Sequence, residues 1–168
     1  MVHEAESKTI SVDARRVGHG EPCFIISEAA VNHNGTLEMA RELVYVAVES
    51  GCDAVKFQTF KTENVCSPLA PKATYQMQTT QATESQLDMI RKFELSFEAF
   101  RELYRYCINK EIIFLSTPFD YESADLLAAL PVPAFKVPSG EITNFVFSGT
   151  CGEKRASVNC FNWHGDHG

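Results

Sequence analysis

Residues 24–58 read FIISEAAVNHNGTLEMARELVYVAVESGCDAVKFQ, which is a short apolar run, a longer amphipathic run and a second short apolar run. The outer runs, Phe24–Ser27 and Ala54–Gln58, are rich in β-forming residues and are typical of strands buried on both faces. Between them, Thr36 can cap a helix whose apolar residues follow helical spacing, and Gly51 can end it. The segment therefore predicts a β-α-β unit.

The same alternation continues toward the C-terminus. Two more short apolar runs, Ile112–Ser116 and Ala134–Val137, predict further strands. A helix capped by Ser96 precedes the first of them, and a helix from about Glu122 to Leu130, stopped by Pro131, precedes the second. The resulting order, β-α-β-loop-α-β-α-β, predicts parallel strands joined by right-handed crossovers.

Two segments lie outside this alternation. Thr9–Val12 predicts an extra strand before the first unit. Residues 61–94 form a long connection in which Thr83 and Gln86 can start a small helix as a capping box. Long connections in compact domains are usually functional lids or local elaborations.

The fold class follows from these elements. A chain of 168 residues favours one domain with a sizeable core. Four β-α strands fit either an open doubly wound sheet or half of an eight-stranded barrel, and no GxGxxG or GxxxxGK[ST] motif follows the first strand to favour nucleotide binding. We predict an α/β fold: a partial (β/α)8 TIM-type barrel comprising its first four parallel strands and their helices.

Composition limits the partners. A formal net charge of -7 argues against nucleic acid and against an anionic membrane surface, but not against a small anion held by a few lysines in a cleft. The polar N-terminus is not a signal peptide, and no apolar run has the roughly 20 residues of a membrane span. Six cysteines without a CxxC pair predict free thiols, so we expect a cytoplasmic protein.

Polar residues gather at the carboxyl end of each predicted strand, where parallel barrels place their active sites. Lysines within buried strands cost several kcal/mol unless an anion or a carboxylate lies nearby. The set comprises Ser27, Glu28, Asn32, His33, Lys56, Gln58, Ser116, Thr117, Lys136, Ser139, Gly140 and Glu141.

Each of these residues, taken alone, could have a structural role instead of a role in binding or catalysis. Lys56 can pair with Glu28, and Lys136 with Glu141, as internal ion pairs of the barrel. His33 alone is more typical of a hydrogen-bonded loop residue than of a ligand. The prediction of a site therefore depends on the whole set.

The same residues carry a family resemblance. Four blocks resemble the N-terminal part of the sialic acid (N-acetylneuraminate) synthases, a family that includes legionaminic and pseudaminic acid synthases. The blocks are SEAAVNHNG (Ser27–Gly35), AVKFQT (Ala54–Thr59), FLSTPFD (Phe114–Asp120) and FKVPSGEITN (Phe135–Asn144).

The resemblance implies a (β/α)8 barrel followed by an antifreeze-like domain, and a homodimer. It implies an enzyme of surface polysaccharide biosynthesis that condenses phosphoenolpyruvate with N-acetylmannosamine or a related amino sugar, giving a nonulosonic acid and phosphate. The residues that match the family's catalytic positions are Glu28, Glu141 and Lys56, and those that match its substrate-binding positions are Lys136, Ser139, Thr117 and Gln58. A divalent metal, Mn or Mg, is implied for the full-length family, but its histidine ligands fall outside this chain, so no metal ligand is assigned.

The resemblance stops at Asn144. The tail from Phe145 onward shows no strand or helix periodicity, and its degenerate codons, read one base later, permit a peptide with the family's STGM motif. We therefore expect a frameshift near Phe145–Phe147; a natural disordered tail is the alternative. This organisation comprises an N-terminal extension (1–21), the first half of a synthase barrel (22–144) and a non-homologous tail (145–168).

This organisation has consequences for the chain as written. Within the tail, His164 and His167 resemble a zinc pair only in spacing. Half a barrel leaves sheet edges unpaired, so we expect the chain to aggregate or stay partly unfolded and to lack synthase activity.

Two other functions stay open. One is a Schiff-base lyase or aldolase that uses Lys136 or Lys56 as its nucleophile. The other is a non-catalytic remnant or binding module.

Overall fold

The computed structural model describes residues 9–70, 85–141 and 143–154. Thr83, His164, His167 and one of the six cysteines, Cys160, lie outside the described residues, and so does the tail beyond residue 154. In the described part of the chain, no helix is long and apolar enough to cross a bilayer. The five cysteines described there are free thiols, of which Cys23 is exposed.

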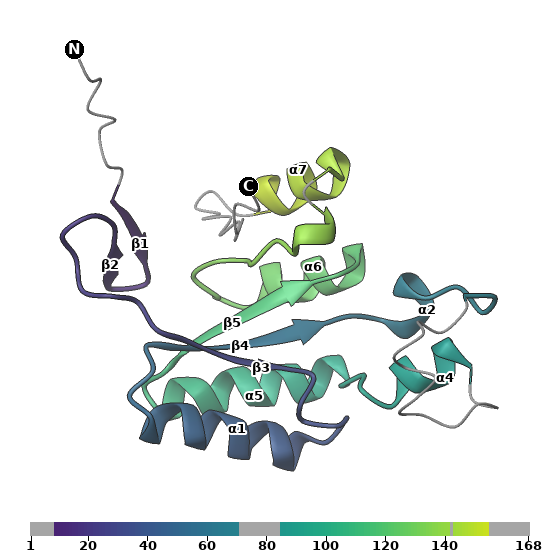
Figure 1. The fold of residues 1–168 in the computed structure, drawn as a ribbon, viewed down its shortest axis with the longest axis horizontal. Helices are drawn as coiled ribbons and strands as arrows, with labels where there is room; N and C mark the ends of the chain where they lie inside the picture. The colour runs from purple at the N-terminus through teal and green to yellow at the C-terminus, as the bar shows by residue number, and fades with distance from the viewer. Residues whose placement is uncertain (1–8, 71–84, 142, 155–168) are drawn as a thin grey trace, which may run out of the picture.

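A parallel sheet of three strands forms the centre of the molecule (Figure 1). The strands are β3 (Ile26–Ala30), β4 (Ala54–Thr59) and β5 (Ile113–Pro118), in the order β3-β4-β5. Both neighbouring pairs are parallel, as the β-α-β pattern predicts. The sheet and its helices form a partial barrel that is not closed within the described residues.

The first and last predicted strands differ from the observed structure. Strand β3 starts at Ile26 rather than Phe24, because the Ile25 N–H bonds to the Asp53 carboxylate at 2.7 Å instead of a neighbouring strand. The predicted strand Ala134–Val137 was wrong: it is reduced to one parallel bridge between Phe135 and Ser116. Pro133 and Pro138 flank it, and proline removes a ladder donor and restricts the preceding residue, which limits the pairing.

The predicted main helices are confirmed. Helix α1 (Leu37–Glu49) starts at Thr36, whose hydroxyl accepts from the Met39 N–H. Helix α5 (Phe97–Asn109) starts at Ser96, which accepts from the Ala99 N–H at 3.1 Å. Helices α1 and α5 lie side by side along one face of the sheet (Figure 1). Helix α6 (Tyr121–Ala129) packs against β5 and starts at Asp120.

The long connection after β4 contains two short helices that contact each other beyond the carboxyl ends of the strands (Figure 1). They are α2 (Thr62–Val65) and α4 (Gln86–Arg91). The predicted small helix is therefore confirmed, but Ser85 caps it through a bond from the Asp88 N–H.

A hairpin of β1 (Ile10–Val12) and β2 (Arg15–Val17) lies at the amino-terminal end of the sheet (Figure 1). The sequence predicted its first strand and missed its second. The fully buried Val12 belongs to an apolar cluster with Ala54, Leu115 and Ala134. The hairpin therefore covers the inner face of the sheet at this end.

The chain after Lys136 forms the 3-10 helix η1 (Ser139–Glu141) and helix α7 (Phe145–Glu153). Residues 145–153 form a helix although their sequence has no clear amphipathic pattern: Phe145 and Val146 are exposed. The Asn144 side chain accepts from the Phe147 N–H at 3.2 Å, and Phe147 and Cys151 lie one turn apart and are buried in the main core. The Phe147 ring also makes an edge contact with Tyr121.

Candidate active site at the inner face of the sheet

Alternation along β4 separates core residues from site residues. Val55 and Phe57 face the helices and join the main core. On the opposite face, Lys56 aligns with Glu28 of β3, and its side chain is only 6% exposed. The Lys56 Nζ and Glu28 Oε2 atoms are 2.5 Å apart. The structural ion pair that was left open for Lys56 is therefore present, with Glu28 on its solvent side.

Lys136 reaches the same place from the segment after α6. A cavity of about 810 Å³ is lined by Lys56, Lys136, Glu28 and Ser139, together with the chain between the hairpin and β3. Burial, and next the nearby charge of Lys56, lower the pKa of Lys136 below its usual value, while the Glu28 carboxylate acts in the opposite direction. The structure thus brings together four of the seven residues that match the family's catalytic or substrate-binding positions; we call this the lysine cavity.

The charge balance of the lysine cavity favours an anion. Two lysines face it, and Glu28 already pairs with Lys56. The other carboxylate in the lining, Glu21, is paired with Arg16 at 2.9 Å. Lys136 therefore provides a positive charge that the neighbouring carboxylates only partly offset, and a bound anion would relieve its repulsion with Lys56.

The other three predicted residues do not line this cavity. Thr117 is almost fully buried on β5, aligned with Gln58, and its hydroxyl has no hydrogen-bond partner. Glu141 accepts from Asn144 Nδ2 at 2.7 Å and lines a separate polar hollow with Asp120. Lys136 and Glu141 therefore line different cavities. The internal ion pair between them, which the sequence left open, is not supported.

Gln58 lines a third space at the carboxyl end of the sheet. This apolar cavity has a volume of about 280 Å³. Its lining consists of Val31, Gln58, Phe60, Val65, Ile90, Phe93 and Phe119. Among the described residues of this lining, Gln58 is the only one with a polar side chain.

His33 is a buried loop residue, as the simpler explanation held. Its Nδ1 accepts from the Gly35 N–H at 3.1 Å, and its Nε2 has no partner. Burial lowers the pKa of His33 to about 4, so the ring is neutral at pH 7. Gly35 has a φ of +76°, and a Cβ there would collide with the carbonyl oxygen of Lys92, which explains the glycine in this turn.

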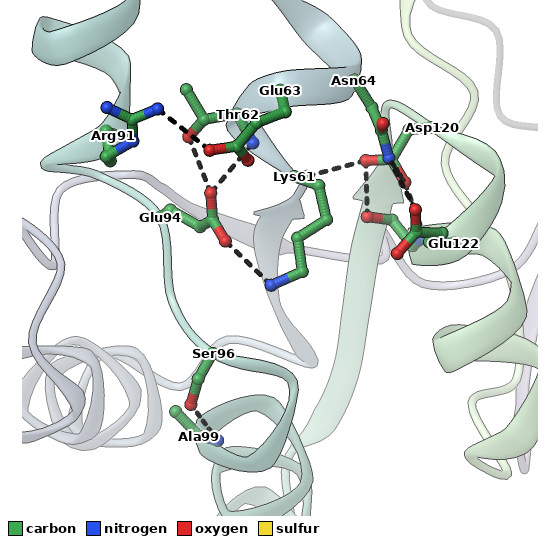
Figure 2. Close-up of polar contacts among 11 residues, drawn as sticks. Lys61, Thr62, Glu63, Asn64, Arg91, Glu94, Ser96, Ala99, Asp120 and Glu122 are labelled. Atoms are coloured by element: carbon green, nitrogen blue, oxygen red, sulfur yellow. Dashed lines mark hydrogen bonds and ion pairs between the residues drawn. The ribbon is translucent and has the colours of Figure 1, made fainter.

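Figure 2 shows a polar network that sequence reasoning missed. The Glu94 carboxylate accepts from Lys61 Nζ at 2.9 Å, from the Thr62 N–H at 2.9 Å and from the Thr62 hydroxyl at 2.7 Å. Asp120 accepts from the Lys61 N–H at 2.8 Å and from the N–H and hydroxyl of Ser123. The network ties α2 to the segment before α5 and to the start of α6. Only Asp120 had a sequence signal, as a residue typical of a helix N-cap.

Metal binding has no support from this part of the molecule. Within residues 9–70, 85–141 and 143–154, no group of three or more His, Cys, Asp or Glu side chains could hold an ion. The described residues therefore do not fit the divalent metal that the resemblance implies, and no chemical step is assigned to it.

Comparison with known proteins identifies the family. The sequence model of the NeuB family matches residues 43–160, a range that includes β4, β5 and α7. The chain belongs to the NeuB family. This NeuB chain spans less than two fifths of the length of the relatives named next, with the match covering 37% to 39% of each.

Three of the curated relatives are named as synthases of N,N'-diacetyllegionaminic acid or of N-acetylneuraminate 9-phosphate. The chain is 53% identical over 124 residues, or 74% of its length, to N,N'-diacetyllegionaminic acid synthase of Campylobacter jejuni. It is 46% identical over 138 residues, or 82% of its length, to the synthase of the same name in Legionella pneumophila. It is 35% identical over 133 residues, or 79% of its length, to human N-acetylneuraminate-9-phosphate synthase.

A solved structure supports the fold. The N-acetylneuraminic acid synthetase of Leptospira borgpetersenii superposes with a TM-score of 0.72, at 24% identity, over 88% of this chain and 47% of that one. The family resemblance is confirmed by the NeuB match and the curated relatives, and the partial barrel is confirmed by this superposition.

Proposed function

We propose that this chain forms the phosphoenolpyruvate-binding half of a nonulosonic acid synthase of surface polysaccharide biosynthesis. The complete enzyme would condense phosphoenolpyruvate with N-acetylmannosamine or a related amino sugar and release phosphate. The observation that carries the proposal is the convergence of Lys56 and Lys136 on one cavity, beside Glu28 and Ser139. The names of the three relatives above, synthases of N,N'-diacetyllegionaminic acid and of N-acetylneuraminate 9-phosphate, support the same reaction class.

The chemistry fits an anionic substrate. Phosphoenolpyruvate carries a carboxylate and a phosphate, and fixed ammonium groups in a partly buried site can bind both and stabilise charge during the reaction. The Ser139 hydroxyl lines the same cavity and can donate to a phosphate oxygen. The enol carbon would then attack the sugar aldehyde, water would add at the neighbouring carbon, and phosphate would leave.

Proton handling is assigned to Glu28. Its side chain is 58% exposed at the rim of the lysine cavity, so its carboxylate can reach a bound substrate. Glu141 lies in the separate hollow and has less support for this role. Thr117 keeps a buried hydroxyl without a partner on the inner strand face, and this supports a binding role for it.

Schiff-base chemistry is the second candidate. One observation favours it: burial lowers the pKa of Lys136, and a lysine that loses its proton more easily is a better nucleophile. Borohydride trapping with pyruvate discriminates the two functions, because only a Schiff base gives a covalent adduct. We expect no adduct from the chain.

Calorimetric titration with phosphoenolpyruvate tests the proposal. We expect Lys136→Ala to weaken binding about tenfold or more, because it removes a charge that faces the ligand. Lys110→Ala is the matched control, since Lys110 is exposed at the end of α5 and contacts Tyr106. Equal affinity of the two variants would refute a phosphoenolpyruvate site in the lysine cavity.

Catalytic turnover is tested separately from phosphoenolpyruvate binding. We expect the purified chain to release no phosphate from phosphoenolpyruvate when N-acetylmannosamine is added. Phosphate release by the chain would contradict its proposed inactivity.

A further inference from the structure

The segment between the hairpin and β3 forms one wall of the lysine cavity. Residues 18–25 belong to no strand or helix. Half of the described residues that line the cavity come from this segment and the end of β2: Val17, Gly18, Glu21, Pro22, Cys23 and Phe24. We call residues 17–24 the cavity wall. Its position affects how closely Lys56 and Lys136 are enclosed.

Asp53 holds the cavity wall at both of its ends. Its Oδ1 atom pairs with Arg15 Nη2 at 2.8 Å, shortly before the wall begins. Its Oδ2 atom accepts from the Ile25 N–H at 2.7 Å, directly after the wall ends. The two oxygens of one carboxylate therefore fix both ends of the wall to the start of β4.

The backbone of Asp53 is itself fixed between two neighbouring chain segments. Its N–H donates to the Ile25 carbonyl at 2.9 Å, and its carbonyl accepts from the Ile113 N–H at 3.2 Å. The Asp53 side chain is only 12% exposed, which limits the competition of water for its bonds. Asp53 is therefore a rigid point of attachment.

Other contacts of the cavity wall are local or non-directional. Arg16 pairs with Glu21 at 2.9 Å, and the Glu21 N–H donates to the Gly18 carbonyl at 3.2 Å, so both contacts join this part of the chain to itself. Val17 and Phe24 pack against the apolar cluster at the amino-terminal end of the sheet, and apolar packing has no preferred direction. Asp53 adds directional bonds to the sheet.

We infer that Asp53 is a positioning residue of the lysine cavity, which holds the cavity wall against Lys56 and Lys136 and so prepares the cavity for an anion. Asp53 is not among the described residues that line the cavity, so it acts through the wall. An anion that enters a preformed site does not have to order the wall, and such ordering would reduce its affinity. The effect on phosphoenolpyruvate rests on the proposed function, whereas the effect on the wall does not.

Variants at both ends of the ion pair test the inference on the whole chain. Asp53→Ala removes both bonds. Arg15→Met removes only the ion pair, at a side chain that is 48% exposed, so the fold should tolerate it. Arg15→Lys keeps a cation opposite Asp53 and should behave like the parent chain. Glu94→Gln is the control for lost stability, because Glu94 bonds to Thr62 and is not among the described lining residues.

The protonation of Lys136 reports the position of the wall. Competitive labelling with acetic anhydride over a pH series, read by mass spectrometry, gives the pKa of individual lysines. Burial lowers the pKa of Lys136 in the parent chain, and the charged groups that line the cavity with it are Lys56, Glu28 and Glu21. When the wall moves away, water reaches Lys136 and its pKa should rise toward its usual value.

We expect this rise in Asp53→Ala and Arg15→Met, but not in Arg15→Lys or Glu94→Gln. Calorimetric titration should show that Asp53→Ala binds phosphoenolpyruvate about tenfold more weakly, which is the effect of ordering roughly one residue on binding. Arg15→Met should lose about threefold, because a partly exposed ion pair contributes less.

The outcomes separate this inference from the proposed function. An unchanged pKa of Lys136 in both Asp53→Ala and Arg15→Met overturns the positioning role, whether or not phosphoenolpyruvate binds. The same rise in Glu94→Gln also overturns it, because lost stability would then be the cause. A rise in the two clamp variants alone, with no phosphoenolpyruvate binding by the parent chain, supports the positioning role and refutes the proposed function. If Asp53→Ala does not fold, the comparison of Arg15→Met with Arg15→Lys decides.

Discussion

We expect Glu94 to fix the long connection after β4 to the rest of the fold. Substitution of Glu94 measures how much these contacts contribute to the free energy of unfolding. Its side chain is 17% exposed, and its two oxygens divide their partners: Oε1 accepts from Lys61, and Oε2 accepts from the N–H and hydroxyl of Thr62. In Glu94→Gln the remaining carbonyl oxygen can still serve Thr62, but the new NH₂ group cannot accept from Lys61. Glu94→Ala removes all three bonds.

The magnitudes follow from burial. A hydrogen bond to a charged group contributes about 1.5–3 kcal/mol, and the partial exposure of Lys61 reduces this, so we expect Glu94→Gln to lower the free energy of unfolding by about 1 kcal/mol. Thr62 is fully buried, so Glu94→Ala also leaves its N–H and hydroxyl without acceptors. Each unsatisfied group costs about 1–3 kcal/mol, so with the lost Lys61 contact a total loss of at least about 3 kcal/mol is expected.

The effect should depend on pH. Burial acts to raise the pKa of Glu94, but the hydrogen bonds from Lys61 and Thr62 and the charge of Lys61 outweigh it, so the pKa lies below its usual value of 4.5. A carboxyl whose pKa is lowered by folding stabilises the fold above its unfolded pKa, and this contribution is lost as the pH falls through the folded pKa. The difference between the parent chain and Glu94→Gln should therefore shrink below about pH 4.5.

Urea unfolding followed by circular dichroism measures these differences. Glu98→Gln is the matched control, because Glu98 is 65% exposed and its contact with Arg101 is 3.5 Å long. Equal unfolding midpoints for Glu94→Ala and the control would refute the view that this network anchors the connection. So would a Glu94→Gln deficit that stays constant from pH 7 to pH 3.

Two further predictions concern other parts of the chain. Because the pKa of His33 falls from 6.5 to about 4 on burial, acidification through that window should lower the free energy of unfolding by up to about 3 kcal/mol, at roughly 1.4 kcal/mol per pH unit. His33→Gln should remove this dependence and His19→Gln, at an exposed residue, should keep it; the same pH profile in both variants would exclude His33 as its source. Resequencing the gene across the codons for Phe145–Phe147 should reveal a frame change, and an unbroken frame there would end that hypothesis.

Local sequence patterns predicted most of the elements, because their causes are local. Thr36 and Ser96 cap helices through their own hydroxyls, and the apolar run at Ala54–Gln58 forms a strand wherever it is buried. The second strand of the hairpin was missed because Arg15 and Arg16 interrupt the apolar pattern by which strands are predicted. Arg15 forms an ion pair with Asp53 at 2.8 Å, and this contact depends on the tertiary fold.

The candidate site was predictable as a set but not as a geometry. Sequence placed Lys56, Lys136, Gln58 and Glu141 at or near strand ends, and strand alternation put Lys56 and Gln58 on the same face of their strand. It could not show that these residues divide among three separate spaces, because that depends on how the connections after the strands pack. The Glu94 network was likewise invisible, since it joins residues more than 30 positions apart.

The hairpin before β3 covers one end of the lysine cavity. Val12 packs with Ala54 and Leu115, and Val17 of the same hairpin lines the cavity, so the hairpin shields this end from solvent. A shortened chain beginning at Pro22 would lose this cover, and buffer anions would reach the two lysines more easily. Such a chain should bind phosphoenolpyruvate less tightly, and the deficit should grow as ionic strength rises.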